Sequence, residues 1–214
     1  MLNTCQIFTV IASYSYQRFL DLHRFKRLMN HNGCWKIKKG NILFYNEIAE
    51  KYDLQYRKEQ MKKYKAGLKT LCPLKESWML DIGSGTGLLV EFIATDSNLI
   101  SVDCSKNMIK QAKHKYGNKQ DFVCADADNL PFRKQTFNNV FSFTLLQNMP
   151  NPEKTIVEML RIAKQGSEIV LSVTKKTFNK MSFLDLFNGK KVGMVKLLDD
   201  KELKDYILVS KCYG

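Results

Sequence analysis

Three glycines at alternate positions follow a short apolar run that ends in an aspartate: Asp81, Gly83, Gly85 and Gly87. A glycine-rich turn between a strand and a helix lets a ligand approach backbone N–H groups beside the positive end of the helix. The dinucleotide fingerprint G-x-G-x-x-G would place its third glycine at position 88, which is a leucine. A carboxylate at position 81 would repel a pyrophosphate and attract an ammonium group. The spacing therefore favours a ligand with a positive group over a dinucleotide.

Two further aspartates stand at the ends of the next two apolar runs. Asp103 comes twenty residues after Gly83, where a carboxylate can accept hydrogen bonds from both hydroxyls of an unphosphorylated ribose. Asp126 ends the third run and is followed by Ala127. Three successive strand ends thus present acids in the order that one cofactor needs: an ammonium group, a ribose diol and an adenine amino group. That cofactor is S-adenosylmethionine.

The elements that must position these residues alternate from residue 77 onward. Short apolar, β-prone runs cover residues 78–82, 99–103, 122–125, 140–143 and 168–173. Helical stretches lie between them, near residues 88–94, 106–115 and 153–163. Such alternation is typical of right-handed crossovers and a parallel sheet covered on both faces. We expect an α/β fold with a Rossmann-like, doubly wound, mostly parallel sheet.

The ends of this region carry their own signals. The helix near 153–163 is expected to start at Asn151 as N-cap, with Pro152 in its first turn and Gly166 just beyond its end. After residue 173 the alternation stops, and the runs 192–198 and 206–212 predict an antiparallel hairpin at one sheet edge.

Residues 41–71 show apolar side chains at helical spacing. The pattern predicts two consecutive amphipathic helices with a polar break near residues 53–55. The second helix should end before Pro73, because a proline restricts the residue that precedes it.

Over about residues 41–214 the sequence resembles the class I S-adenosylmethionine-dependent methyltransferases. The matching segments are LDIGSGTG (80–87), SVDCSKNMI (101–109), CADADNLPF (124–132) and VFSFTLLQNMPNPEK (140–154). The upstream segment YNEIAEKYD (45–53) is similar to the family's N-terminal helix, which caps the cofactor. The resemblance therefore implies S-adenosylmethionine as cofactor and a methyltransferase activity.

The resemblance also implies roles for individual residues. Around the methionine moiety it places Asp81, Gly83, Gly85 and Gly87, and at the ribose it places Asp103. Around the adenine it places Cys104, Met108, Asp126 and Ala127, and beside the reactive methyl group it places Thr144 and Leu145. Helix-face packing remains an alternative for Cys104 and Met108, and an N-cap role remains an alternative for Asp103.

The catalytic residues stay open. Where many small-molecule members of the family have histidine, this chain has Gln147 and Asn148, so a histidine base is not expected there. These two amides could orient a substrate, and Tyr45 and Tyr52 could line the transfer site or simply belong to the core. His114 is expected to be solvated on a helix. The catalytic candidates are thus Tyr45, Tyr52, Gln147 and Asn148, and no metal site is expected.

Methyl transfer from a sulfonium is an in-line displacement, so alignment can suffice and a base is needed only for a protonated acceptor. The fourth run ends in Phe-Thr-Leu-Leu, not in Asn-Pro-Pro-Tyr, and no Pro-Cys nucleophile follows it. We expect a nitrogen or oxygen acceptor. A short segment between residues 174 and 192 and basic flanks favour RNA: Lys58, Lys62, Lys63, Lys65, Lys69, Lys175, Lys176 and Lys180. Alternatives are a small metabolite, a protein, or a non-catalytic binding module, and a small activating protein is conceivable as a partner.

The chain of 214 residues is strongly basic, with 34 Lys and Arg, 21 Asp and Glu, and a formal net charge of +13. Residues 1–76 hold 15 bases and 6 acids, residues 77–174 hold 10 of each, and residues 175–214 hold 9 and 5. The segment with the cofactor motif is therefore neutral, and an anionic partner is expected to meet the flanks.

Residues 1–40 hold seven bases and one acid. We expect a basic N-terminal extension over 1–40 and one methyltransferase domain over 41–214. The extension can be interpreted as a disordered RNA-contacting arm, an organelle transit sequence, or a segment outside the folded unit. Six scattered cysteines without a C-x-x-C pair indicate reduced thiols in a cytoplasmic protein. No apolar run is long enough to predict a membrane span.

Overall fold

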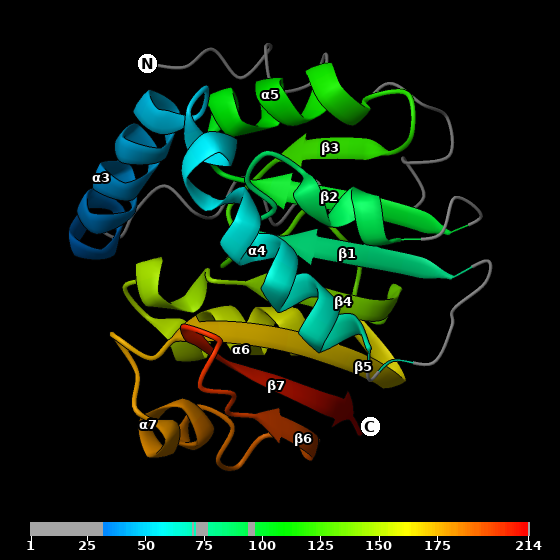
Figure 1. Cartoon of the computed structure of the whole chain (residues 1–214). Helices are drawn as coiled ribbons and strands as arrows, with labels where there is room; N and C mark the ends of the chain where they lie inside the picture. The colour runs from blue at the N-terminus through cyan, green and yellow to red at the C-terminus, as the bar shows by residue number, and fades with distance from the viewer. Residues whose placement is uncertain (1–31, 70, 72–76, 94–96, 214) are drawn as a thin grey trace.

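Seven strands form one sheet in the order β3-β2-β1-β4-β5-β7-β6 (Figure 1). The computed structural model describes residues 32–69, 71, 77–93 and 97–213. The strands are β1 (Trp78–Ile82), β2 (Asn98–Asp103), β3 (Asp121–Cys124), β4 (Phe137–Phe143), β5 (Ala163–Thr174), β6 (Val192–Leu198) and β7 (Asp205–Cys212). All pairs are parallel from β3 to β5, whereas β7 is antiparallel to both β5 and β6. The expected doubly wound sheet with a C-terminal hairpin is confirmed.

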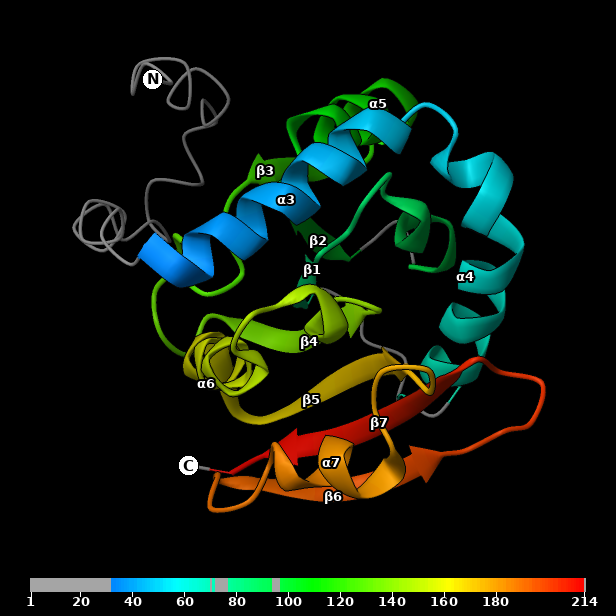
Figure 2. The same cartoon turned by 90° about the vertical axis from the view of Figure 1, so that its left-hand side faces the viewer.

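Helices cover both faces of this sheet. They are α3 (Asn32–Ile48), α4 (Tyr52–Leu68), α5 (Lys106–Tyr116), α6 (Pro152–Ile162) and α7 (Lys180–Asp185), with short 3₁₀ helices η1 (Leu88–Phe92) and η2 (Leu146–Asn148). Figure 2 shows α4 and α6 on opposite faces of the sheet, and α3 across its front edge.

The core follows from the period-two alternation of side chains along each strand. On β1, Leu80 and Ile82 join the cluster that includes Met159 of α6. Met79, which precedes Leu80 and points to the other face, joins the opposite cluster, which includes Tyr64 of α4. The sheet is therefore buried on both faces, and its carboxyl-end edge is left to build a site.

The helix caps agree with the sequence in part. Asn151 caps α6 through its side chain, which accepts a hydrogen bond from the Lys154 backbone N–H, and Pro152 lies in the first turn. Gly166 does not end this helix, because β5 already begins at Ala163 and contains Gly166 at a φ of 79°. The stretch near 88–94 is a 3₁₀ turn and not an α-helix.

The N-terminal helices start and break earlier than expected. Helix α3 begins at Asn32, so the boundary expected between residues 40 and 41 falls inside a helix. The break lies at residues 49–51 and not near 53–55, since α4 starts at Tyr52. Residues 1–31 of the expected extension lie outside the described residues. The division into an extension and a domain therefore stays a prediction.

Two features are absent from residues 32–69, 71, 77–93 and 97–213: a membrane-spanning helix and a cluster of metal-binding side chains. None of the helices in that part of the chain combines the length and apolar character that a membrane span needs. The same residues hold no group of three or more His, Cys, Asp or Glu side chains placed to share a metal ion.

Candidate functional site

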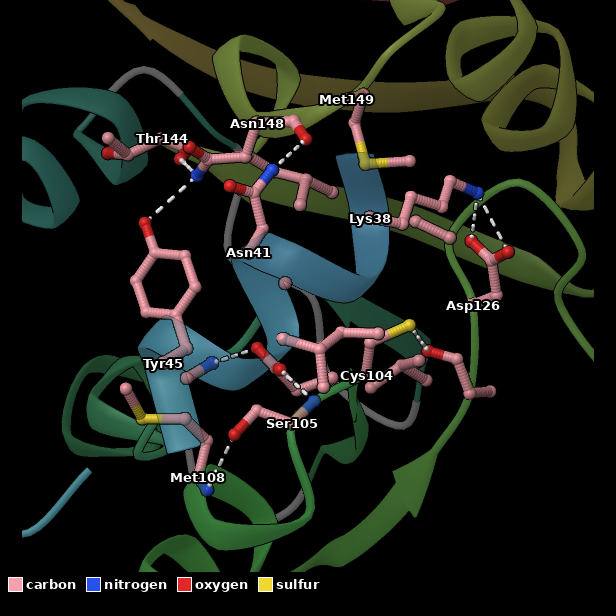
Figure 3. Close-up of a pocket in the computed structure, with 18 of the residues that line it drawn as sticks. Lys38, Asn41, Tyr45, Cys104, Ser105, Met108, Asp126, Thr144, Asn148 and Met149 are labelled. Carbon is pink, nitrogen blue, oxygen red and sulfur yellow. Dashed lines mark hydrogen bonds and ion pairs between the residues drawn. The ribbon is translucent and has the colours of Figure 1, made fainter. Parts of the chain in front are cut away.

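A pocket opens at the carboxyl ends of β1, β2 and β4, beneath helix α3 (Figure 3). It encloses about 760 Å³ of space, including the part open to solvent. The lining residues that the sequence predicted are Tyr45, Tyr52, Gly83, Gly85, Asp103, Cys104, Met108, Asp126, Ala127, Thr144, Leu145 and Asn148. Most of the predicted site is thus gathered around one cavity.

The glycine turn forms the floor at the end of β1. Gly83 and Gly85 both have positive φ angles, 75° and 55°, which glycine adopts without strain. A Cβ on Gly83 would lie 3.0 Å from Cδ1 of Leu145, so the missing side chain also allows close packing. Gly87 does not line the pocket: a Cβ there would lie 2.9 Å from the ring of Phe122. Glycine is needed at this position because Phe122 packs against it, and the G-x-G-x-G spacing alone does not reveal this contact.

Asp81 lies behind this turn and is only 3% exposed. Its Oδ2 atom is buried and has no hydrogen-bond partner among the described residues. Burial, with a smaller effect of the Asp103 charge, raises the pKa of Asp81 to about 8. A buried carboxyl oxygen without a partner is energetically costly, so a cationic or hydrogen-bond-donating group beside it would be stabilised.

Asp103 ends β2 and faces the pocket. Its two oxygens accept hydrogen bonds from backbone N–H groups, Oδ2 from Gly85 at 2.9 Å and Oδ1 from Ser105 at 2.8 Å. Burial raises the pKa of Asp103, and these two hydrogen bonds oppose the rise. The N-cap of α5 is Ser105, whose hydroxyl accepts from the Met108 N–H. Capping is therefore done by Ser105, which leaves the remaining lone pairs of Asp103 for a ligand.

The next part of the wall is apolar and sulfur-rich. Met108 is 1% exposed and still lines the pocket together with Ala127. The Cys104 thiol donates a hydrogen bond to the Ala125 carbonyl at 3.1 Å, and burial raises its pKa well above the usual range. Cys104 thus stays a neutral thiol and presents a polarizable surface suited to a flat ring.

Helix α3 is fastened over the pocket by an ion pair that the sequence did not predict. Lys38 Nζ lies 2.7 Å from both oxygens of Asp126 and 2.6 Å from Oδ2 of Asp128. Burial lowers the pKa of Lys38, but the two carboxylates outweigh this effect and raise it overall. Because Lys38 occupies the carboxylate of Asp126, the expected contact of Asp126 with the adenine edge stays a prediction.

The C-terminal end of α3 is held by Asn46. Its side-chain carbonyl accepts from the Ser105 hydroxyl at 2.8 Å and from the Asn107 backbone N–H at 3.0 Å. Lys38, near the middle of α3, and Asn46, near its C-terminal end, therefore tie the helix to the loops that follow β3 and β2. Its inner face, with Asn41 and Tyr45, forms the roof of the cavity.

The four catalytic candidates separate into two groups. Tyr45, Tyr52 and Asn148 line the pocket, and Asn148 Nδ2 donates to the Tyr45 hydroxyl at 2.9 Å. Gln147 does not line it, and its Nε2 donates to the Thr144 carbonyl at 2.8 Å. Burial is the main reason that the pKa values of both tyrosines are raised, so they remain neutral phenols.

Thr144 joins the pocket to a buried charge network. It has a φ of 61°, unusual for a β-branched residue, at the end of β4. Its hydroxyl lies 3.0 Å from Lys63 Nζ and 3.1 Å from Asp205 Oδ2. Lys63 is 1% exposed and pairs with Asp205 at 3.0 Å and with Glu59 at 2.9 Å. Ser172 adds a hydrogen bond to Asp205 at 2.8 Å. The strained turn is thus held from below by an ion pair.

Several lining residues were missed from the sequence, among them Lys38, Asn41 and Met149. Lys38, Asn41 and Tyr45 recur at helical spacing, so one helix face would have united them if the helix had been extended before residue 41. No comparable signal existed for the Lys63–Asp205 pair. Lys63 stands in a run of lysines, most of them exposed, and its partner lies near the other end of the chain.

Comparison with known proteins agrees with this geometry. A family model described as a methyltransferase domain matches residues 80–171. The uncharacterized protein MJ1123 of Methanocaldococcus jannaschii is 32% identical over 157 residues, which cover 73% of this chain and 71% of that protein. Demethylmenaquinone methyltransferase of Clavibacter sepedonicus is 27% identical, over 63% of this chain and 58% of that enzyme. The chain spans 20% of a longer relative, the bifunctional biotin biosynthesis protein BioHC of Cellvibrio japonicus.

A solved structure has the same fold. It is a chain of the complex between the Haloferax volcanii Trm112 methyltransferase activator and a methyltransferase, with a TM-score of 0.70. The match covers 79% of this chain and 98% of that chain, at 14% sequence identity. At this identity the likeness concerns the fold alone.

Proposed function

Because the chain belongs to the class I S-adenosylmethionine-dependent methyltransferases, we propose that it transfers a methyl group from S-adenosylmethionine to a nitrogen or oxygen nucleophile. The observation that carries this proposal is the buried, unpartnered Oδ2 of Asp81 beside the glycine turn. An orphaned carboxylate there matches a ligand with an ammonium group, and Asp103 offers acceptors for a ribose diol.

The residues present fit this cofactor: lining residues suit its ribose and adenine, and Asp81, which does not itself line the pocket, lies behind the glycine turn. Asp81, Gly83 and Gly85 would hold its methionine part, Asp103 its ribose, and Cys104, Met108 and Ala127 its adenine. When bound, the cofactor supplies an electrophilic methyl group on a sulfonium. The chain's own part is to orient the two reactants and to exclude water, for which α3 forms a roof above the site.

The acceptor atom must already be unprotonated when it binds. The acidic side chains among the described lining residues are Asp103 and Asp126. Asp103 is bound by two N–H groups and Asp126 by Lys38. Tyr45, Tyr52 and Cys104 stay protonated because burial raises their pKa values. We therefore propose an acceptor that is already unprotonated, such as a ring nitrogen or a carboxylate oxygen.

RNA is the acceptor class that we propose first. The outer face of α4 forms a shallow groove that includes Lys58, Lys62 and Lys65, together with Asp53 and with Arg57, which is paired with Glu91. This groove starts close to Tyr52, which lines the pocket. A row of lysines leading away from a methyl-transfer site suits a phosphate backbone. Of the expected basic flanks, however, Lys63 is buried and Lys175 is paired with Asp199.

A small-metabolite acceptor is the second candidate. It is favoured by the α3 roof, which narrows access to the pocket, and by the similarity to demethylmenaquinone methyltransferase. The structural similarity to a chain from a Trm112 complex supports a small activating protein as a further candidate partner.

Calorimetry with S-adenosylmethionine tests the first step, and Asp103→Ala should weaken binding by about 1–3 kcal/mol through lost charge-assisted hydrogen bonds. Absence of binding to the purified protein, with and without cell extract, would refute the enzyme proposal. Transfer of tritiated methyl into fractionated RNA, protein and metabolite pools then identifies the acceptor. Label confined to the metabolite pool would refute RNA and support the second candidate.

A further inference from the structure

The roof and the far wall of the pocket meet in a small polar cluster (Figure 3). The Asn148 side-chain amide donates to the Tyr45 hydroxyl at 2.9 Å and to the Thr144 carbonyl at 3.3 Å. The Asn148 backbone carbonyl accepts from Asn41 Nδ2 at 2.7 Å. Tyr45 and Asn148 both line the pocket.

These contacts fix the orientation of the Asn148 amide. The Thr144 carbonyl can only accept, so the atom that bonds to it must be the NH₂ nitrogen. The same nitrogen reaches the Tyr45 hydroxyl, which therefore accepts and keeps its own proton free. Both side-chain hydrogen bonds of Asn148 therefore use its Nδ2 atom, and neither uses its Oδ1 atom.

Two hydrogen-bonding functions remain unused at this point. Within the part of the chain that the structure describes, no hydrogen bond uses Asn148 Oδ1 or the hydroxyl proton of Tyr45. Burial raises the pKa of Tyr45, so its proton stays in place at neutral pH. One acceptor and one donor are therefore available side by side.

The pair is held by the framework behind it. The Thr144 carbonyl accepts from Gln147 as well as from Asn148. Thr144 itself is anchored through its hydroxyl to the buried Lys63–Asp205 ion pair. A site whose supporting residues are fixed in this way can discriminate between ligands by hydrogen bonding.

We propose that Tyr45 and Asn148 form the subsite that recognises the acceptor, and that they read the edge of a nucleobase. This assignment rests on the proposed methyltransferase function. Every nucleobase presents a donor next to an acceptor on its pairing edge, which complements the Asn148 carbonyl and the Tyr45 hydroxyl. A carboxylate, with acceptors only, would leave Asn148 Oδ1 facing an oxygen. The lysines of the α4 groove favour a nucleotide over another amide, because they can meet its phosphates.

Matched nucleotides test the proposal directly. The protein is saturated with S-adenosylhomocysteine, which lacks the transferable methyl group. Saturation-transfer NMR then measures binding of uridine and guanosine 5′-monophosphates and of their N3-methyl and N1-methyl forms, which lack the ring N–H donor beside the carbonyl oxygen. At least one intact nucleotide should bind about tenfold more tightly than its blocked form, since one neutral hydrogen bond is lost. N-acetylglutamine amide and phenol are tested in the same way, as representatives of amide and phenol acceptors that would compete with the nucleotide proposal.

Variants locate the effect. Tyr45→Phe removes the donor and Asn148→Ala removes the acceptor, and each should abolish most of the preference for the intact nucleotide. Cofactor affinity should change by less than about twofold, because neither hydrogen-bonding group is assigned to the cofactor. Tyr213→Phe and Asn188→Ala are the matched controls, since both residues lie outside the pocket lining.

The outcomes separate the two proposals. Absence of S-adenosylhomocysteine binding counts against the methyltransferase function itself. Normal cofactor binding with equal affinity for intact and blocked nucleotides overturns the nucleobase subsite. So does binding of the amide or the phenol without binding of any nucleotide.

Discussion

Two buried aspartates stand at the same edge of the sheet in opposite electrostatic situations. Asp81, at the end of β1, has an oxygen without a partner, and its pKa is raised to about 8. Asp205, at the start of β7, is fully buried and is paired with Lys63 and hydrogen-bonded by Ser172 and Thr144. Both carboxylates are desolvated, but only one is compensated within the chain.

This difference separates a binding residue from a supporting residue. A buried carboxylate that is left unpaired lowers the stability of the free protein and gains when a cation arrives. A buried carboxylate that is already paired within the chain contributes no interaction to the ligand, and it holds the residues around it in place. Asp81 therefore keeps an unpartnered oxygen with which the ammonium group of the proposed cofactor would pair. Asp205 instead fixes the Thr144 turn, which shapes the proposed acceptor wall.

The largest expected effect comes from breaking the compensated pair. Lys63→Met leaves Asp205 buried without a countercharge and should lower the free energy of unfolding by about 3–5 kcal/mol. Urea unfolding followed by circular dichroism measures it. Lys62→Met is the matched control, because Lys62 is exposed on the same helix and its loss should change stability by about 0.5 kcal/mol or less. A cost below 1 kcal/mol for Lys63→Met would mean that Asp205 is not held by this pair.

The opposite result is expected on the uncompensated side. Asp81→Asn replaces a buried carboxyl, which has an oxygen without a partner in the free protein and cannot ionise there without cost, by a neutral amide, so the melting temperature should stay the same or rise. S-adenosylmethionine binding should weaken by about 2–3 kcal/mol, because a charge-assisted interaction is lost. Calorimetry and thermal unfolding of the same sample give both values. Asp121→Asn, an exposed aspartate at the start of β3, should change neither.

A loss of stability in Asp81→Asn as large as that of Lys63→Met would erase the distinction between the two regions. Unchanged cofactor affinity in Asp81→Asn would instead show that this carboxylate does not face the ligand.

The pH dependence of the free protein sharpens the same contrast. The pKa of Asp81 is higher in the folded state than the unfolded value of about 3.9, so the folded protein binds this proton more tightly. Its contribution to stability is complete below the unfolded pKa and is lost as the pH rises through about 8. Between pH 6 and pH 8 the wild-type protein should lose about 2 kcal/mol more than Asp81→Asn does. Parallel stability curves for the two proteins would show that Asp81 does not titrate in this range.

The sequence predicted the cofactor side better than the supporting side, for a physical reason. The carboxyl ends of β1 and β2 are set by local apolar runs, and the expected segments 78–82 and 99–103 end where the strands end. Asp81 and Asp103 could therefore be placed at one edge from the chain alone. The antiparallel hairpin followed from two β-prone runs joined by a polar turn.

Long-range pairs could not be placed in this way. Lys63 belongs to a lysine-rich helix and nothing local distinguishes it from Lys62, yet its burial depends on Asp205 arriving from β7. The excess of basic residues in segment 1–40 places Lys38 in the basic extension. In the structure, Lys38 instead forms ion pairs with Asp126 and Asp128. Charge counts predict a surface only when each lysine lacks a tertiary partner.

The smallest expected effect tests whether the two regions communicate through Thr144. Its hydroxyl bonds to both members of the Lys63–Asp205 pair, and its carbonyl faces the amides of Gln147 and Asn148. Thr144→Val keeps the branched shape at a φ of 61° and removes the hydroxyl, which should lower the free energy of unfolding by about 1 kcal/mol.

Thr144→Ser keeps the hydroxyl and should remain close to wild type in urea unfolding. If the supporting network shapes only the acceptor wall, Thr144→Val should weaken acceptor binding and leave the cofactor affinity within about twofold of wild type, because Asp81 and Asp103 do not contact this hydroxyl. A parallel loss of cofactor affinity in Thr144→Val, absent from Thr144→Ser, would mean that the Asp205 region also sets the geometry of the glycine turn. The compensated and uncompensated carboxylates would then act as one unit, since Leu145 packs directly against Gly83 and would transmit the shift.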